Sequence, residues 1–410
     1  MKQKLLYLLL VPSFFYGESL IELINYAHVN NNVIISKNLK EKSKKYEVES
    51  SQSLNKPTFD IGGFYQNLNK KSPSMPGDIY NGYAKISYDI YDGGKKSFDI
   101  KSKDNELKST IYENIAYKKN LSLQIVQDFF NIKNIDASIS ALEEEKKSLE
   151  AQLQRVKKFY KAQLSTTDEI DKLQSAYDTN SFNIQSSKFQ RLSIIQSLEL
   201  KIGKKILKLN SGEFNKLADV RLKIDDNINS LVVQAKSLEN KANSINSVYS
   251  PHIIISDTYN IYEYDRTDDF HPEGLDNQNK LMINVSMRIF DGGAISKKKQ
   301  SIMINKQALK VQIDYKIQEQ KMLYNLSISR INTNKLKIKS AKSALTSATS
   351  AYKTIEKKYK AGLVDNIVYL DALSIKTNAT ALYTKSLNDL EVAYAIYYYY
   401  AGQKIKEFIK

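Results

Sequence analysis

The chain has 410 residues, with 61 basic and 45 acidic side chains and a formal net charge of +16. It contains no cysteine, which excludes disulfides, thiolate metal sites and cysteine nucleophiles. Its three histidines are too scattered for a zinc or acid-base cluster. We therefore expect no catalytic residues, no metal site and no cofactor.

Residues 1–17 are expected to form a secretory signal peptide. Two lysines precede an apolar run at 5–11, and the small Gly17 comes before a polar glutamate. The alternative is an N-terminal anchor helix, but this run is shorter than the roughly 18 apolar residues that span a bilayer. The sequence therefore predicts an exported protein.

Helix-breaking residues are confined to a few places. After the leader, prolines occur only in two windows, near 57–94 and 251–293. No glycine lies between Gly94 and Gly203, or between Gly293 and Gly362. Such long stretches without either residue, rich in lysine, glutamate, leucine and isoleucine, predict long helices.

The two windows that contain the breakers have the alternation of β-strands. Apolar residues at 84, 86, 88 and 90 alternate with polar ones. In the second copy, apolar residues at 281, 283, 285, 287 and 289 alternate with Met282 and with polar residues at 284, 286 and 288. Each strand therefore has one apolar and one polar face. The expected strands lie near 57–67, 79–91, 252–264 and 280–290, and the loops within the two hairpins are marked by Pro73, Pro76 and Pro272.

The sequence contains an internal repeat. Residues 87–95, Ser-Tyr-Asp-Ile-Tyr-Asp-Gly-Gly-Lys, match 286–294, a shift of 199 positions. Tyr160-Lys-Ala-Gln-Leu matches Tyr359-Lys-Ala-Gly-Leu at the same shift. A constant offset between the two landmarks predicts one rigid helix between them. The expected organisation is a first repeat at 18–210 with helices 95–160 and 168–205, a second at 211–403 with helices 294–359 and 366–401, one helix before each strand pair, and a tail at 404–410.

The long helices carry a heptad pattern. Steps of four and three residues from Leu107 meet an apolar residue at twelve of sixteen positions, and at eleven of sixteen when shifted by 199. Each helix of about 65 residues would be roughly 100 Å long. We expect coiled-coil hairpins whose tips follow Tyr160 and Tyr359.

Four strands are too few to form a closed sheet. In lipid an apolar-faced sheet must close, because open edges leave backbone groups unsatisfied, and the smallest closed membrane barrels have about 8 strands. Several copies must therefore pool their strands, and three copies would supply twelve. The predicted fold class is a mixed α/β membrane protein with long helical hairpins in two repeats and four strands per chain, which contribute to a trimeric twelve-stranded outer-membrane barrel.

Residues 20–403 resemble the TolC-type outer-membrane efflux proteins. The plan of strands, Asp-Gly-Gly, long helix, tip and return helix occurs twice, and the most specific stretch is Tyr359-Lys-Ala-Gly-Leu-Val-Asp-Asn-Ile-Val-Tyr-Leu-Asp-Ala-Leu. The resemblance implies an outer-membrane homotrimer with a twelve-helix tunnel in the periplasm and no catalysis. It further implies passive exit of substrates in a tripartite efflux or type I secretion system. The implied partners are a periplasmic adaptor, an inner-membrane transporter and outer-membrane lipid, with no nucleic acid.

The same resemblance implies a gate at the periplasmic end. Glu169 stands where an acidic residue holds the closed aperture, Tyr359 at an aperture tyrosine, and Asp371 at an inward acid that forms a ring in the trimer. Val364 replaces a basic latch and Val368 a second acidic ring, which does not favour a strong salt bridge. The alternatives are a solvated Asp371 and a Tyr359 packed in its heptad seam.

Two further groups of residues are expected to shape the turns. At the hairpin tips these are Leu164, Gly362 and Leu363, within docking loops near 161–168 and 360–367. The strand-to-helix turns are formed by Asp92, Gly93, Gly94, Asp291, Gly292 and Gly293. The latter lack the spacing and the Lys-Ser/Thr of a phosphate loop, so a structural turn with an aspartate cap is favoured.

A second class of function remains open: a secreted or nucleic-acid-associated structural coiled-coil protein. The surplus of lysine could bind nucleic acid, but the lysines are spread along the helices rather than clustered. A rod has no use for strands with an apolar face, and both copies have them. The strand alternation therefore favours the outer-membrane exit duct of an efflux or secretion system over a structural rod.

Overall fold

The computed structural model describes residues 18–70, 77–210, 212–217, 219–265 and 275–410. The expected signal peptide lies outside these ranges, as do the prolines of the expected hairpin loops, Pro73, Pro76 and Pro272.

The fold class of long helical hairpins with four antiparallel strands is confirmed. In chain order the elements are α1 (Leu20–Asn30), α2 (Asn32–Ser53), β1 (Thr58–Asn67), β2 (Asp78–Tyr91), α3 (Lys95–Lys161), α4 (Thr167–Ile202), α5 (Asp226–Asn246), η1 (Ser247–Tyr249), β3 (His252–Asp265), β4 (Asn277–Ser286), α6 (Ala294–Lys360), α7 (Asn366–Tyr400) and η2 (Ile405–Phe408).

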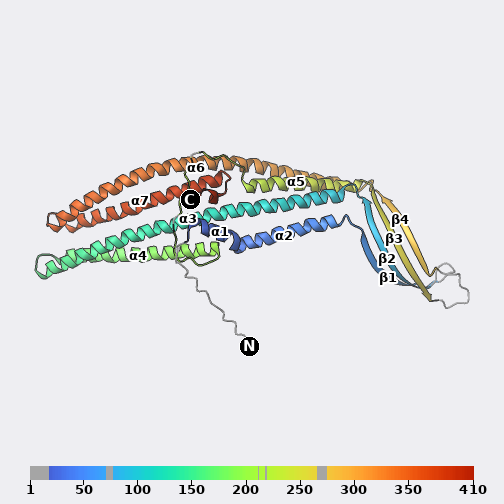
Figure 1. The fold of residues 1–410 in the computed structure, drawn as a ribbon, viewed down its shortest axis with the longest axis horizontal. Helices are drawn as coiled ribbons and strands as arrows, with labels where there is room; N and C mark the ends of the chain where they lie inside the picture. Colours follow the sequence, from blue (N-terminus) through green and yellow to red (C-terminus); the bar gives the residue numbers. More distant parts are fainter. Residues whose placement is uncertain (1–17, 71–76, 211, 218, 266–274) are drawn as a thin grey trace, which may run out of the picture. The chain divides into compact units, whose positions relative to one another are not determined.

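Two helices, α3 and α6, dominate the chain, each with 67 residues. After a short tip, α4 returns beside the later part of α3, and α7 returns beside α6 (Figure 1). Arg191 of α4 pairs with Asp136 of α3, and Lys337 of α6 pairs with Asp389 of α7 at 2.9 Å. In the part of the chain that the structure describes, no helix is both long enough and apolar enough to cross a membrane.

The chain divides into two compact units. Among the described residues, unit 1 draws on 18–36, 115–225 and 318–410, and unit 2 draws on 37–114 and 226–317. Each unit thus draws on both sequence repeats, and each long helix contributes to both units.

The core of unit 1 gathers residues from α1, α3, α4 and α7. Tyr397 and Tyr398, near the end of α7, are at most 2% exposed. The segment between α4 and α5 is tied to this core, because the Val220 amide donates to the Tyr397 hydroxyl at 2.9 Å. The Phe214 amide donates to a carboxylate oxygen of Glu391 at 2.8 Å. A segment without regular structure is thereby fixed against a helix.

In unit 2, α3 and α5 pack through buried serines spaced seven residues apart. The hydroxyls of Ser102 and Ser237 lie 2.9 Å apart, and those of Ser109 and Ser230 lie 2.8 Å apart. Small side chains at a heptad spacing let two helices approach closely, and these hydrogen bonds satisfy the buried hydroxyls.

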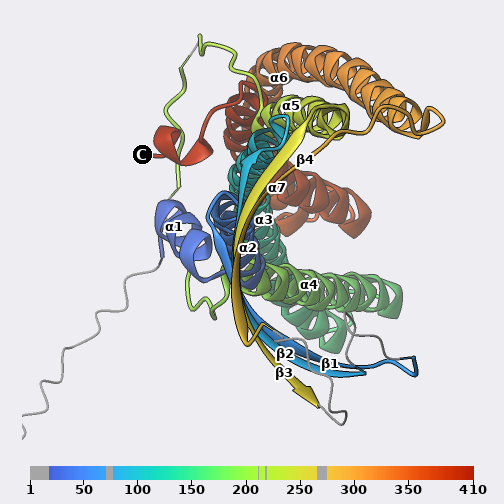
Figure 2. The same ribbon diagram turned by 90° about the vertical axis from the view of Figure 1, so that its right-hand side faces the viewer.

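The four strands form one antiparallel sheet in the order β1-β2-β3-β4, seen as a curved ribbon in Figure 2. Register places Ile255 between Tyr88 and Ile283 on one face. On the other face, Thr258 lies between Lys85 and Lys280. The sheet therefore has the expected apolar and polar faces. Its apolar face is open, with exposed fractions of 77% for Ile61, 68% for Leu281 and 65% for Val285.

Strand β4 ends earlier than the alternation predicts. Its last residue, Ser286, pairs with His252, the first residue of β3 after Pro251. Beyond Ser286 there is no β3 residue to pair with, so Met287 and Ile289 lie outside the strand. The side-chain pattern continues to residue 290, but the partner strand sets where the ladder stops.

Candidate functional site

Both strand-to-helix turns have the same geometry. Asp92 accepts hydrogen bonds from the amides of Gly94 at 2.9 Å and Lys96 at 2.7 Å. Both glycines of this turn have positive φ angles, +70° at Gly93 and +80° at Gly94. The aspartate thus satisfies amides at the start of α3 that have no partner within the helix.

The second turn repeats these contacts and adds another. Asp291 accepts from the amides of Gly293 at 2.9 Å and Ile295 at 2.8 Å, and Gly292 and Gly293 have φ angles of +69° and +83°. The Tyr249 hydroxyl also donates to Asp291 at 2.8 Å. The Ile295 amide, followed by the Tyr249 hydroxyl, lowers the pKa of Asp291 below its usual value. These contacts are those of a helix cap.

At the tips, both long helices end through the same backbone turn. The Leu164 amide donates to the Phe159 carbonyl, and the Leu363 amide donates to the Lys358 carbonyl, each at 2.9 Å. The residue before each leucine is left-handed, with φ of +75° at Gly362 and +61° at Gln163. Glycine takes this conformation without strain, whereas glutamine does not.

The two tip leucines are open to solvent. Leu164 is 74% exposed and Leu363 is 73% exposed. Each lies between a long helix and its return helix, where no residue of its own hairpin covers it. The two tips therefore present matching apolar side chains.

Two of the expected gate residues meet between the hairpins of unit 1. The Tyr359 hydroxyl of α6 donates to Glu169 Oε1 of α4 at 2.6 Å, and the Ser165 hydroxyl donates to Oε2 at 2.7 Å. Tyr359 is 6% exposed. Burial, and then the hydrogen bond to Glu169, raise the pKa of Tyr359 above its usual value. The hydroxyl therefore stays protonated as a donor.

The third expected gate residue stands apart. Asp371 is exposed on α7, and the pocket that contains Glu169 and Tyr359 does not include it. Within the described ranges its carboxylate has no hydrogen bond or ion pair. A single chain thus brings Glu169 and Tyr359 together without Asp371.

Arg155 of α3 was missed by the sequence interpretation. Its guanidinium donates through Nη2 to the carbonyl of Lys360, the last residue of α6, at 2.7 Å. It also lies over the rings of Phe159, at 5.0 Å, and Tyr359, at 5.6 Å. The sequence does contain one hint of a special role, because Arg155 is one of six arginines among 61 basic residues.

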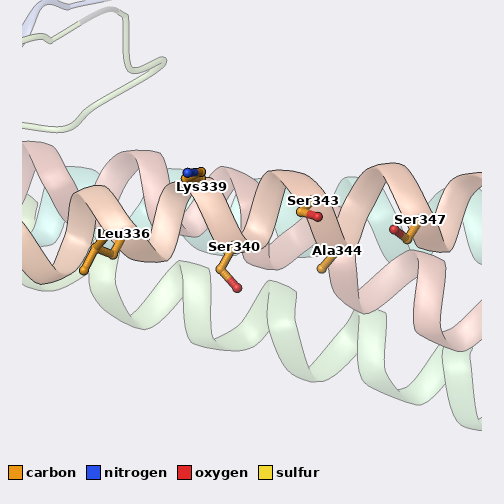
Figure 3. A pocket seen from close by; sticks show the side chains of 6 residues that line it. All are labelled: Leu336, Lys339, Ser340, Ser343, Ala344 and Ser347. Atoms are coloured by element: carbon orange, nitrogen blue, oxygen red, sulfur yellow. The ribbon is translucent and has the colours of Figure 1, made fainter.

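A pocket of about 500 Å³ opens between the two tips. Arg155, Glu169 and Tyr359 line it, together with tip residues Leu164 and Gly362. A second, shallower depression of about 530 Å³ follows one side of α6. Figure 3 shows that side chains of a single helix line it, mostly small ones; they are Leu336, Lys339, Ser340, Ser343, Ala344 and Ser347. Of these two, the pocket between the tips is the one that joins several elements.

No protein-family model matches the sequence, and no curated protein matches it either. Solved structures do match the fold. The Campylobacter jejuni CmeC outer membrane channel has a TM-score of 0.83 at 16% identity, covering 96% of this chain and 86% of that chain. The outer membrane protein VceC from Vibrio cholerae has a TM-score of 0.81 at 13% identity, covering 94% and 96%. A membrane protein from Pseudomonas aeruginosa has a TM-score of 0.82 at 13% identity, covering 93% of each chain.

This chain has the fold of these outer membrane proteins. The match extends over both helical hairpins and the sheet, since more than nine tenths of the chain is covered in each comparison. The tips described above are the turning points of the hairpins in this fold.

Proposed function

We propose that this chain is the outer-membrane exit duct of a tripartite efflux or type I secretion system. It passes substrates delivered by an inner-membrane pump and a periplasmic adaptor, and it catalyses no reaction. One observation carries the proposal: a sheet with an exposed apolar face is joined to two long helical hairpins in a single chain. Outer membrane channels share this fold.

The sheet supports assembly into a homotrimer. Strands β1 and β4 each have one unpaired edge within the chain, and lipid does not tolerate open edges. Three chains supply twelve strands, enough to close a barrel. The apolar face then meets outer-membrane lipid and the polar face lines the lumen.

The tips support a gate at the periplasmic entrance. The bond between Tyr359 and Glu169 holds the two hairpins of a chain together in the closed state. The free carboxylate of Asp371 supports an acidic ring, in which three copies meet on the axis. Like charges on a narrow axis attract cations, so the closed entrance prefers cations despite the net charge of +16.

The tip loops 161–168 and 360–367 also suit docking of the adaptor. Leu164 and Leu363 expose most of their side chains there. Exposed apolar side chains at the centre of a small surface are typical of protein contacts.

Membrane fractionation followed by a gel of unheated sample tests the function. The expected result is that the protein sediments with outer membranes and runs as an oligomer that heating converts to the monomer. A soluble monomer or dimer would overturn the duct and favour the structural coiled-coil protein.

Conductance of purified trimers in a planar bilayer tests the acidic ring. Asp371→Asn should reduce the preference for cations and the sensitivity to divalent ions. Asp171→Asn is the matched control, because it removes an exposed carboxylate at nearly the same place in the first repeat. Unchanged selectivity in Asp371→Asn, or equal effects of both variants, would contradict the ring.

A further inference from the structure

One side chain crosses from the first hairpin to the end of the second. We propose that Arg155 is a positioning residue that clamps the end of α6 onto the first hairpin and so keeps Tyr359 on Glu169. The clamp is a property of one chain; its meaning as part of a gate rests on the proposed function.

The clamp meets a requirement of the backbone at the end of α6. The last carbonyls of a helix have no donor within the helix. The Lys360 carbonyl receives one from Arg155 Nη2 at 2.7 Å. The Lys360 ammonium does not serve this purpose, because it pairs with Glu356 at 2.7 Å. A donor from the other hairpin thus completes the end of α6.

The planar shape of the arginine side chain suits both of its contacts. A guanidinium is planar, so it can donate within its plane while its faces lie over aromatic rings. Arg155 does both, with Phe159 and Tyr359 as the rings. A lysine ammonium has no such plane, so it would reach the carbonyl or the rings but not both. This accounts for an arginine in a chain whose other basic residues are nearly all lysines.

The clamp also contacts the ring of Tyr359. The Tyr359 ring stacks on Tyr369, with centroids 4.8 Å apart and planes at 18°, and Arg155 lies over the same ring. The hydroxyl is bound by Glu169, whose other oxygen is occupied by Ser165. The ring is therefore held by contacts on its face and at its hydroxyl. Loss of Arg155 releases one of these contacts and the adjacent helix end together.

The second repeat has no counterpart of this clamp. At the positions 199 residues later, Arg155, Ser165 and Glu169 are replaced by Thr354, Val364 and Val368. None of these three carries a charge, and the Thr354 hydroxyl donates to the Ser350 carbonyl of its own helix at 3.1 Å. The counterpart of Tyr359 is Tyr160, which is 45% exposed. The first hairpin therefore holds the second, and the second has no equivalent hold on the first.

Amide hydrogen exchange of the full-length protein tests the clamp without reference to transport. In Arg155→Ala and Arg155→Lys, exchange at residues 358–364 should be about tenfold faster than in the wild type, as expected for loss of a charge-assisted hydrogen bond. Exchange at the first tip should not change. Lys157→Ala is the matched control, because it removes an exposed charge from the same stretch of α3. Wild-type exchange in both Arg155 variants, or an equal increase at both tips, would overturn the clamp.

A double-mutant cycle separates a positioning role from a general structural one. If Arg155 acts through Tyr359, adding Tyr359→Phe to Arg155→Lys should increase exchange by less than the product of the two single effects. Independent effects would contradict the coupling. Closed-state conductance of the same variants then tests the gate. If hydrogen exchange shows that the clamp is lost but closed-state conductance does not rise, the proposed gate is rejected and the clamp is still supported.

Discussion

The two long helices have the same length but very different surroundings. In the largest apolar cluster of unit 1, α3 contributes Ile125, Phe129 and Ile132 with no exposed surface, whereas α6 contributes one buried residue, Ile331. Large apolar side chains on α6 remain open instead, with 70% of Leu336 exposed. The repeat thus preserved the course of the backbone, while burial followed from the elements that pack on each copy.

Charge differs between the helices in the same way. Within its bounds α6 has sixteen basic and three acidic side chains, whereas α3 has fourteen and ten. Most of the excess positive charge of the chain therefore lies on α6. A solvated helix tolerates such an imbalance because water and salt screen it.

The largest expected effect compares equivalent core positions. Phe129→Ala should cost about 3–5 kcal/mol of stability, because it empties a fully buried site. Its counterpart 199 residues later, Ile328, is 38% exposed, and Ile328→Ala should cost about 1 kcal/mol or less. Thermal unfolding of both variants measures the difference. An equal cost at Ile328 would show that another chain covers this side of α6.

The strands offer a comparison in which the repeats should behave alike. Ile86 and Val285 occupy equivalent positions on the apolar face and are 51% and 65% exposed. An arginine at either should destabilise the sheet in lipid, by up to about 2–4 kcal/mol at the middle of a bilayer and by less at Val285, one residue before the end of β4. Arginine at the neighbouring Ser87 or Ser286, on the polar face, should be tolerated. The yield of heat-sensitive oligomer measures this, and equal losses from both faces would refute the alternation.

The equivalent tyrosines at the tips should differ. Tyr359→Phe removes a hydrogen bond to the Glu169 carboxylate and should cost about 1.5–3 kcal/mol. Tyr160→Phe should have little effect, because Tyr160 is 45% exposed and its hydroxyl has no hydrogen bond among the described residues. Chemical denaturation followed at the tips distinguishes them. A similar cost for both would place the Tyr359 contribution in its ring rather than its hydroxyl.

Exchanging the left-handed tip residues is a smaller, reciprocal test. Gly362→Gln should destabilise the second tip by about 1 kcal/mol, and Gln163→Gly should stabilise the first by a similar amount. Gly362→Val should cost more, because a β-branched residue is worse in this conformation. Hydrogen exchange at each tip reports the change. No gain from Gln163→Gly would mean that its side chain compensates for the strain.

The smallest effect concerns acid sensitivity at the turns. The pKa of Asp291 is lowered in the folded chain, so its contribution is complete above the unfolded pKa of about 3.9 and is lost as pH falls through the folded value. Tyr249→Phe removes one cause of the shift, so the loss of stability below about pH 4 should be smaller. Thermal unfolding between neutral and acidic pH measures it. Identical pH profiles would show that the Tyr249 hydroxyl contributes nothing.

Much of the fold was predictable because local rules determine it. The spacing of glycine and proline located the long helices, and period-2 alternation located the strands and their faces. The Asp-Gly-Gly turns were equally accessible, since glycine permits positive φ and aspartate caps a helix.

Features that depend on distant partners were not predictable. The single helix expected before the first strand pair is broken between α1 and α2 without glycine or proline. At the break, the side-chain oxygen of Asn31 accepts hydrogen bonds from the backbone amides of Val33 and Ile34. The side-chain nitrogen of Asn31 donates to the Lys201 carbonyl of α4. The role of Arg155 was hidden for the same reason, because its acceptor lies 205 residues away.

The unpaired edge strands of the sheet have a consequence for the chain before it assembles. The edge strands β1 and β4 have ten residues each, and the inner strands β2 and β3 have fourteen. In the proposed duct, a newly exported chain that has not met its partners therefore carries an open apolar surface flanked by two unpaired edges, which other unfolded chains can join. The interval between export and assembly is its most vulnerable period, and that interval lengthens as the chain becomes scarcer. In the proposed duct, we therefore expect the speed at which partner chains meet to matter as much as the stability of the finished molecule.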